Sequence, residues 1–159
     1  MNNTMLANLH SDKDDWRTPK DLFNALNADF HFTLDPCSTH ENALCEKHFT
    51  KVEDGLIQDW SGETVFMNPP YGSEISKWIK KAYEESLKNA TVVCLIPARV
   101  DTSYWHDYIF PYAANIRFIR GRLHFSESKS PAGFPSALVL FHKVSHGHYK
   151  ELIYTKETK

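Results

Sequence analysis

The stretch T-V-F-M-N-P-P-Y-G-S, from Thr64 to Ser73, decides the fold. Residues 64–67 are β-branched or apolar, and such a run predicts a short buried strand. The two prolines after Asn68 fix φ and cannot donate hydrogen bonds to a sheet, so the chain must leave the sheet in one direction. Gly72 permits a tight turn, and Ser73 is a suitable residue for the start of a helix. The stretch therefore predicts a strand, a rigid turn and a helix, as in α/β proteins.

The rigid turn holds Asn68 and Tyr71 at the carboxyl end of a strand, where open α/β sheets bind ligands. This arrangement suits a planar amine such as N6 of adenine. The Asn68 side-chain carbonyl and the Pro69 backbone carbonyl would accept the two amine hydrogens, and the nitrogen lone pair would turn outward. Tyr71 would stack on the base. We therefore predict the catalytic residues Asn68, Pro69, Pro70 and Tyr71; the alternative is a proline-rich loop with no chemical role.

With this motif the chain resembles the amino-methyltransferases, which use S-adenosyl-methionine and carry an [N/D/S]-P-P-[Y/F] sequence. The resemblance implies S-adenosyl-methionine as the cofactor. Positioning of the amine against an electrophilic methyl group would supply most of the catalysis, because no strong base is needed.

The composition describes one globular domain. Its 159 residues suffice for a single core, and 42% of them are hydrophobic. We expect no membrane association, because there is no apolar run of about 18 residues and no signal-peptide pattern. The odd number of cysteines, at positions 37, 45 and 94, indicates reduced thiols and a cytoplasmic protein. We expect a polar arm, a domain and a tail at residues 1–15, 16–145 and 146–159.

The charge is unevenly distributed along the chain. The net charge of −2 by itself argues against a nucleic-acid partner. Residues 1–80 carry 7 basic and 13 acidic side chains, or −6, whereas residues 81–159 carry 11 and 7, or +4. A face that binds nucleic acid would therefore lie in the second half, although such an asymmetry is equally typical of a solvated surface.

The segment Trp16-Arg17-Thr18-Pro19 precedes an expected helix. Thr18 is a suitable N-cap, Pro19 suits the first helical position and Asp21 the third. A well-capped helix explains Thr18 and Pro19 but leaves Trp16 and Arg17 unexplained.

Residues 30–34 alternate as a strand and run into Asp35-Pro36-Cys37-Ser38. A strand that ends in an acid and a tight turn is where a methyltransferase binds the methionine part of its cofactor. Asp35 would accept from the ammonium group, and backbone amides of the turn would meet the carboxylate. A second strand is expected over residues 47–50, after which an acid beside an apolar residue, as in Asp54-Gly55-Leu56, would bind the cofactor's adenine amine and cover its ring.

The second half predicts the remaining elements. Ile75, Trp78, Ile79 and Ala82 recur at helical spacing, so this helix should pack on the sheet. We expect further strands over residues 91–96, 115–119 and 137–141.

Polar residues follow these strands. Arg99 and Asp101 stand at the carboxyl end of the central strand; Asp101 is also a suitable cap for the next helix, which carries Trp105 and should end at Pro111. Gly121 places Arg122 on a permissive turn. We predict DNA contacts from Arg99, Asp101, Thr102, Arg120 and Arg122.

The chain carries the short sequences W-R-T-P, L-D-P-C-S with Asn42 after it, D-G-L, D-W, N-P-P-Y-G, L-I-P-A-R-V-D-T and G-R-L-H-F. Together they resemble the small phage-type DNA N6-adenine methyltransferases of the Dam family. The resemblance covers residues 16–141 and implies methyl transfer to adenine N6 in double-stranded DNA. The cofactor-binding residues we predict are Trp16, Thr18, Pro19, Asp35, Pro36, Cys37, Ser38, Asn42, Asp54 and Asn68.

The chain departs from larger amino-methyltransferases in one respect. Pro-Cys-Ser replaces their G-x-G loop, and the interval from Asp35 to Asn68 leaves no room for a full second βα unit. The acid that would hold the cofactor's ribose is therefore open between Glu46 and Glu53.

Other functions share some of these signals. Cys37, His40, Cys45 and His48 have C-x2-H-x4-C-x2-H spacing, which would suit a zinc-stabilised DNA-binding module without enzymatic activity. That reading leaves the Asn-Pro-Pro-Tyr motif unexplained, so we predict no metal. An amino-methyltransferase acting on RNA, on cytosine N4 or on a protein glutamine would use the same motif.

We therefore expect a single three-layer α/β domain with a mostly parallel sheet, the Rossmann-like fold of S-adenosyl-methionine-dependent methyltransferases. The family resemblance implies that the last hairpin strand runs antiparallel. This length leaves no separate target-recognition domain, so base specificity must come from loops around residues 99–105 and 120–135, with a homodimer as a way to add contacts.

Overall fold

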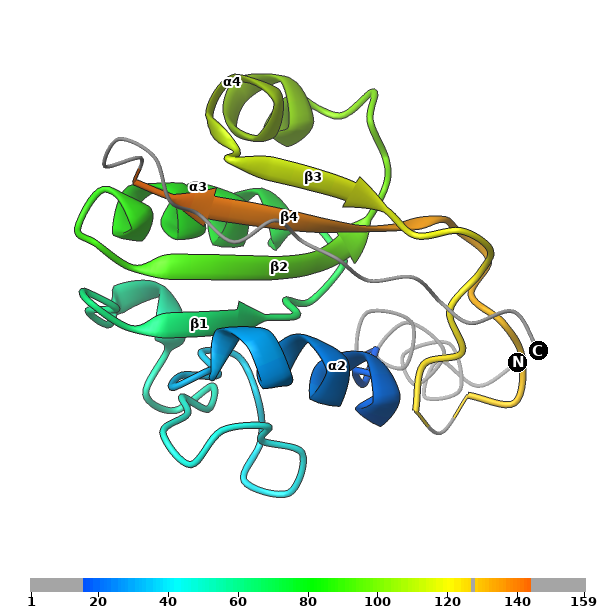
Figure 1. The fold of residues 1–159 in the computed structure, drawn as a ribbon, viewed down its shortest axis with the longest axis horizontal. Helices are drawn as coiled ribbons and strands as arrows, with labels where there is room; N and C mark the ends of the chain where they lie inside the picture. The colour runs from blue at the N-terminus through cyan, green and yellow to red at the C-terminus, as the bar shows by residue number, and fades with distance from the viewer. Residues whose placement is uncertain (1–15, 127, 144–159) are drawn as a thin grey trace, which may run out of the picture.

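The computed structural model describes residues 16–126 and 128–143 (Figure 1). The expected arm and tail, 1–15 and 146–159, lie outside the described residues. The elements in chain order are α2 (Lys20–Phe30), the 3-10 turn η1 (Gly55–Ile57), β1 (Thr64–Met67), α3 (Ile75–Ser86), β2 (Thr91–Pro97), the π-helical segment η2 (Trp105–Ile109), α4 (Phe110–Tyr112), β3 (Asn115–Phe118) and β4 (Ser136–His142). No helix among these described residues is long and apolar enough to cross a membrane.

The four strands form one mixed sheet in the order β1-β2-β4-β3. β1 and β2 are parallel, with Val65 opposite Val92, whereas β4 is antiparallel to both β2 and β3. The expectation of a mostly parallel sheet is therefore wrong. β4 returns through the loop of residues 119–135 and inserts between β2 and β3, antiparallel to both, so β1 and β2 are the only parallel pair among the named strands. The antiparallel last strand that the resemblance implied is confirmed.

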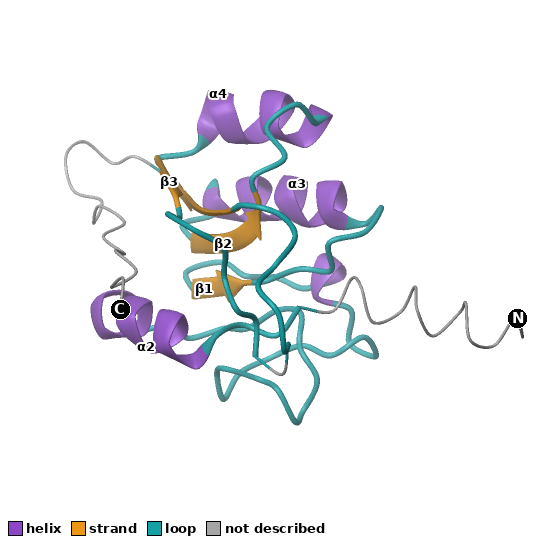
Figure 2. Cartoon of the chain, turned by 90° about the vertical axis from the view of Figure 1, so that its right-hand side faces the viewer, coloured by secondary structure: helices purple, strands orange, loops and turns teal. Residues whose placement is uncertain are grey.

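Helices cover both faces of the sheet: α2 and α3 lie on opposite sides of β1 and β2 (Figure 2). Phe23 of α2 packs edge to face against Phe66 of β1, with 5.3 Å between ring centroids. On α3, Ile79 and Ala82 are fully buried, as their helical spacing predicted. The Tyr83 ring of α3 stacks on Tyr112 of α4 at 4.4 Å, which joins the two helical segments. The expected helical layers on both faces are therefore present.

The two strands expected before β1 are reduced to isolated bridges. α2 continues to Phe30 and ends at His31, whose left-handed φ of 55° turns the chain. Of residues 30–35, Leu34 pairs with Val65 and Asp35 pairs with His48, both in parallel. The apolar alternation that predicted a strand arises instead from aromatic stacking, with the Phe30 and Phe32 ring centroids 5.5 Å apart.

Two predicted helix boundaries are also wrong. α2 begins at Lys20 with Pro19 as its cap residue, and no side chain caps it, so Thr18 is not the N-cap. Pro111 does not end its helix, because η2 continues directly into α4 and through Pro111 to Tyr112. The wider π turn before Pro111 accommodates a residue that has no N–H for an ordinary helical bond.

Candidate active site

The candidate site lies where β1 and β2 end, beside the start of α2 and the loop between β3 and β4, at the right of Figure 1. A cavity of about 460 Å³ opens here. The predicted site residues that line it are Trp16, Thr18, Asp35, Cys37, Ser38, Asn42 and Asn68. Sequence segments from three different regions, which we expected to share one site, therefore do meet in the structure.

Asn68 stands directly after β1, and its side-chain amide has two different environments. Its Nδ2 donates to the Trp16 carbonyl oxygen at 2.5 Å and to Thr18 Oγ1 at 3.0 Å. Its Oδ1 is buried and has no hydrogen-bond partner among the described residues. A buried amide oxygen without a donor is costly, and a bound group that donated a hydrogen bond to it would remove that cost. Asn68, which lines the cavity, therefore has one buried acceptor without a partner among the described residues.

Asp35 is buried at the cavity wall, and both of its carboxylate oxygens accept backbone hydrogen bonds. Oδ1 accepts from the Cys37 amide at 3.4 Å, and Oδ2 accepts from the Leu44 amide at 3.1 Å. Burial raises the pKa of Asp35 above its ordinary value of 3.8, although the Leu44 and Cys37 amides oppose this rise. A cation bound beside the carboxylate would relieve this penalty, so Asp35 is suited to an ammonium group.

The turn after Asp35 does not supply the amides that we expected to meet a cofactor carboxylate. The Cys37 amide already donates to Asp35, and the Ser38 amide donates to the Phe49 carbonyl at 3.1 Å. Lys20, at the start of α2, lines the same cavity and is the more suitable group for a carboxylate. Pro36 and Pro19 are not among the residues that line the cavity, although each adjoins one that does.

Asp54 caps the 3-10 turn η1, and its Oδ1 accepts from the Leu56 amide at 3.1 Å. Asp54 does not line the cavity. Its φ of 56° is in the left-handed region, which is uncommon for residues other than glycine. Glu53, one of the two candidates for the ribose acid, is hydrogen-bonded to the Thr50 amide. The Asp54 turn packs against Pro36, so the two loops expected to hold the cofactor are neighbours.

Tyr71 is only 3% exposed and belongs to an aromatic cluster beside the cavity. Its hydroxyl donates to the Leu95 carbonyl at 3.1 Å, and burial raises the pKa of Tyr71. Phe125 and Phe134 pack edge to face against its ring at 6.1 and 5.7 Å, and Trp16 contacts the same two phenylalanines. A base that stacked on Tyr71 would therefore take the place of one of these phenylalanine rings.

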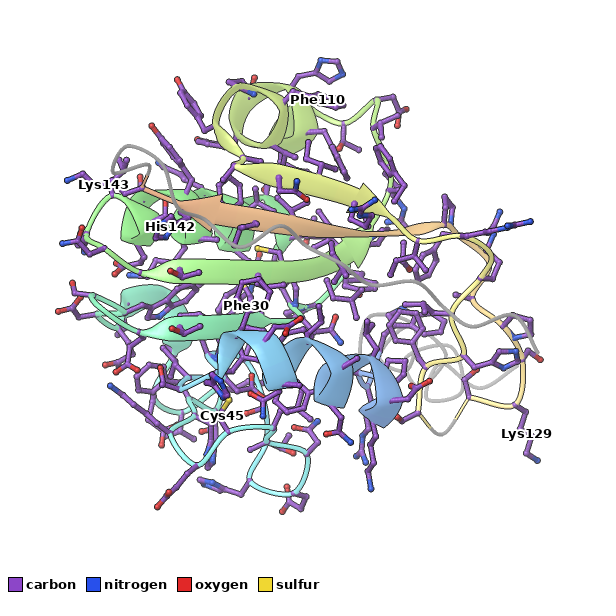
Figure 3. The ribbon with its side chains drawn as sticks, viewed as in Figure 1. Phe30, Cys45, Phe110, Lys129, His142 and Lys143 are labelled. Carbon is purple, nitrogen blue, oxygen red and sulfur yellow. The ribbon has the colours of Figure 1, made fainter. Side chains whose placement is uncertain are left out.

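The predicted DNA-binding arginines lie on two exposed turns, which we call the rim, and the Arg99 turn adjoins this cluster. Arg99, Arg120 and Arg122 are exposed, and the Arg99 guanidinium lies 5.5 Å from the Phe134 ring centroid. Gly121 has a φ of 75°, so the permissive turn predicted before Arg122 is present. Thr102 donates from its hydroxyl to the Arg99 carbonyl at 2.7 Å and so holds the turn that carries Arg99. Figure 3 shows Lys129 pointing outward from the loop between β3 and β4.

The zinc alternative finds no support in the described part of the chain. His40 and His48 are 2.8 Å apart at their ring nitrogens, but no three His, Cys, Asp or Glu side chains of the described residues gather as metal ligands. Burial instead raises the pKa of Cys45 to about 12, which keeps its thiol protonated.

Sequence reasoning missed several residues of the cavity wall. Glu41 and Leu44 lie close in sequence to predicted residues and could have been included on that ground. Ser126 carried no signal, because it reaches the site only through the long loop between β3 and β4. Its amide donates to the Arg17 carbonyl at 3.0 Å and its hydroxyl to the Thr18 carbonyl at 2.9 Å.

Comparison with known proteins identifies the family of the chain. A family model described as DNA N-6-adenine-methyltransferase (Dam) matches residues 6–158. A DNA N-6-adenine-methyltransferase of Haemophilus phage HP1 is 32% identical over 149 residues, which cover 88% of this chain and 86% of that protein. A DNA N-6-adenine-methyltransferase of Escherichia phage T1 is 32% identical over 114 residues, which cover 70% of this chain and 47% of that protein. The chain therefore belongs to the DNA N-6-adenine-methyltransferase (Dam) family.

Proposed function

We propose that the chain transfers a methyl group from S-adenosyl-methionine to N6 of adenine in double-stranded DNA, with Asn68 as the residue that receives the amine. As a member of its family it is a DNA adenine-N6 methyltransferase. The names of its phage relatives specify DNA and adenine N6, and no observation favours RNA, cytosine N4 or a protein glutamine.

The observation that carries the residue assignment is the unpartnered Oδ1 of Asn68. Because Nδ2 already donates to two acceptors, the oxygen is the part of the amide left to accept from the substrate. It would accept one hydrogen of the adenine amine, and the Pro69 carbonyl would accept the other. The amine lone pair would then turn away from the ring, and these fixed dipoles would stabilise its developing positive charge.

The residues around Asp35 fit S-adenosyl-methionine. Asp35 would hold its ammonium group, because a buried carboxylate with a raised pKa gains most from a cation. Lys20 would meet the carboxylate, and the turn at Asp54 would lie toward the adenine end. When bound, the cofactor supplies an electrophilic methyl group. The contribution of this chain is to align the amine with that group and to exclude water from the cavity.

The DNA would bind over the rim that carries Arg99, Arg120 and Arg122. These exposed guanidinium groups would neutralise phosphates, while the target base enters the aromatic cluster beside Tyr71. A second copy of the chain would add contacts to the DNA beyond those of the loops at this rim. We place this reaction in the cytoplasm, consistent with the reduced state of all three cysteines.

Transfer of a tritiated methyl group to unmethylated DNA, followed by nucleoside analysis, tests the proposal. RNA and a glutamine-containing protein serve as alternative acceptors. We expect label in N6-methyladenine from DNA and none in N4-methylcytosine; label confined to RNA or protein would refute the proposal.

A further inference from the structure

A segment near the start of the domain contacts the turn from Asn68 to Tyr71, which we call the catalytic turn. We call residues 16–18 the strap; it supplies both acceptors of the Asn68 amide, the Trp16 carbonyl and Thr18 Oγ1. A carbonyl oxygen can only accept a hydrogen bond, so the nitrogen of the Asn68 amide must face the strap. The opposite orientation would place two acceptor oxygens against each other.

The strap is itself held from its outer side. Ser126 donates its amide to the Arg17 carbonyl and its hydroxyl to the Thr18 carbonyl, at 3.0 and 2.9 Å. Thr18 is only 8% exposed, so its hydroxyl is an interior contact of Asn68 and not a surface one. A continuous chain of hydrogen bonds therefore runs from the loop between β3 and β4, through the strap, to the catalytic amide.

We propose that Thr18 is a positioning residue, which keeps the Asn68 amide turned so that Oδ1 faces the substrate amine. The inference rests on the proposed function of Asn68 and adds a role for the strap. With Thr18 present, both hydrogens of the amide nitrogen are bound, and rotation about the last side-chain bond would lose both contacts at once. Without the Thr18 hydroxyl, only the contact with the Trp16 carbonyl remains. The Asn68 amide can then turn over, and it would offer the substrate amine a donor in place of an acceptor. Thr18 thus acts through Asn68 and does not touch the reacting atoms.

The test uses Thr18→Val, which keeps the shape and removes the acceptor, and Thr18→Ser, which restores the acceptor. We expect Thr18→Val to lower kcat by about five- to tenfold, the usual effect of one neutral hydrogen bond. The dissociation constant for DNA should stay within about twofold, and Thr18→Ser should recover most of kcat. An unchanged kcat in Thr18→Val, or equal losses in the two variants, would overturn the inference. A raised cofactor dissociation constant as the sole change would overturn it too, in favour of direct cofactor contact.

A measurement on the unaltered protein tests the two contacts without the Thr18 variants. In protein labelled with ¹⁵N asparagine, both Asn68 amide hydrogens should exchange with solvent more slowly than those of exposed Asn24, with the Asn68 signals assigned from Asn68→Ala. Exchange at the rate of Asn24 would refute the two contacts on which the inference depends. Failure of the underlying function has a different signature, because Asn68→Ala would then retain its turnover whatever Thr18→Val does.

Discussion

Gly55 and Pro36 lie so close that a Cβ atom on residue 55 would come within 2.0 Å of the Pro36 carbonyl oxygen. Gly55 begins the 3-10 turn η1, and Pro36 lies in the turn after Asp35. This contact joins the two loops that we expect to hold opposite ends of the cofactor. The Trp60 indole holds the Gly55 side of this contact, since its Nε1 donates to the Gly55 carbonyl at 3.0 Å.

Gly55→Ala should therefore destabilise the protein and weaken cofactor binding together. The backbone at Pro36 cannot move without moving Asp35, so we expect a loss of about 1–3 kcal/mol in the free energy of unfolding. Denaturant titration and calorimetry with S-adenosyl-methionine measure the two effects. Gly133→Ala is the matched control, because a Cβ there meets no atom within 4 Å. Equal stabilities of the two variants would mean that the loops are not held by this contact.

Asn68→Ala should lower kcat by at least about 100-fold, the usual loss when a preorganised dipole is removed from a developing charge. Cofactor affinity should remain within a few-fold, because the variant keeps Asp35 and its loop. Single-turnover methyl transfer measures the first quantity, and Asn24→Ala, on the exposed side of α2, is the control. A variant that kept most of its turnover would refute the role of Asn68 as amine acceptor.

Asp35→Asn should weaken S-adenosyl-methionine binding by about 1.5–3 kcal/mol, the usual value for a charge-assisted hydrogen bond. Exposed Asp107→Asn is the control for a change of net charge. Unchanged affinity by calorimetry would place the ammonium group elsewhere.

The same carboxyl group predicts a pH dependence of binding. Because burial raises the pKa of Asp35 above 3.8, the ionised form that attracts an ammonium is lost at a higher pH than for an ordinary aspartate. Affinity should therefore fall as the pH is lowered through this raised pKa. Binding is measured at a series of pH values below about 7, where an α-amino group with a pKa of about 7.8 remains protonated. Asp35→Asn should lack this fall, and an identical profile in the two proteins would exclude Asp35 as its cause.

Glu85→Gln should lower the free energy of unfolding by about 1.5–3 kcal/mol, because hydrogen bonds to a buried charge are lost. The Glu85 carboxylate is 1% exposed, accepts from the Trp60 amide at 2.9 Å, and pairs with Lys81 at 2.7 Å. Burial opposes its ionisation, but the hydrogen bonds from Lys81 and Lys88 prevail and lower the pKa of Glu85 below 4.5. Its contribution is therefore present above pH 4.5 and is lost as the pH falls toward the folded-state pKa.

Chemical denaturation at a series of pH values checks the effect of Glu85. Glu84→Gln is the control, because the Glu84 side chain is 51% exposed and its ion pair with Lys80 spans 3.8 Å. If the two variants lose stability equally at neutral pH, the buried contacts of Glu85 do not stabilise the fold.

Arg122→Ala should weaken binding to all DNA sequences alike and lower the salt dependence of log K by about one unit, as expected for one phosphate contact. Arg99→Ala should also lower turnover, because Arg99 stacks on Phe134 next to Tyr71. Binding over a salt series measures both, with Lys80→Ala on α3 as the control. If both arginine variants showed the same salt dependence of log K as the unaltered protein, the DNA would bind elsewhere.

The sequence by itself determined the features that depend on local geometry. Helical spacing predicted α3, and apolar runs predicted β1, β2, β3 and β4 to within one or two residues. The prolines after Asn68 placed that residue at a strand end, and the Asp35 turn was expected beside it. Each of these follows from the conformations available to a few neighbouring residues.

The tertiary structure alone decided the features that depend on chain segments far apart. The position of β4 between β2 and β3, and hence the mixed sheet, is set by how the last hairpin packs. Thr18 reads as a helix cap from its neighbours, yet its hydroxyl binds Asn68, because the strap crosses the catalytic turn. Ser126 completes that contact from 108 positions away along the chain. Such contacts form only when non-local surfaces are buried together, and no local pattern of residues encodes which surfaces these will be.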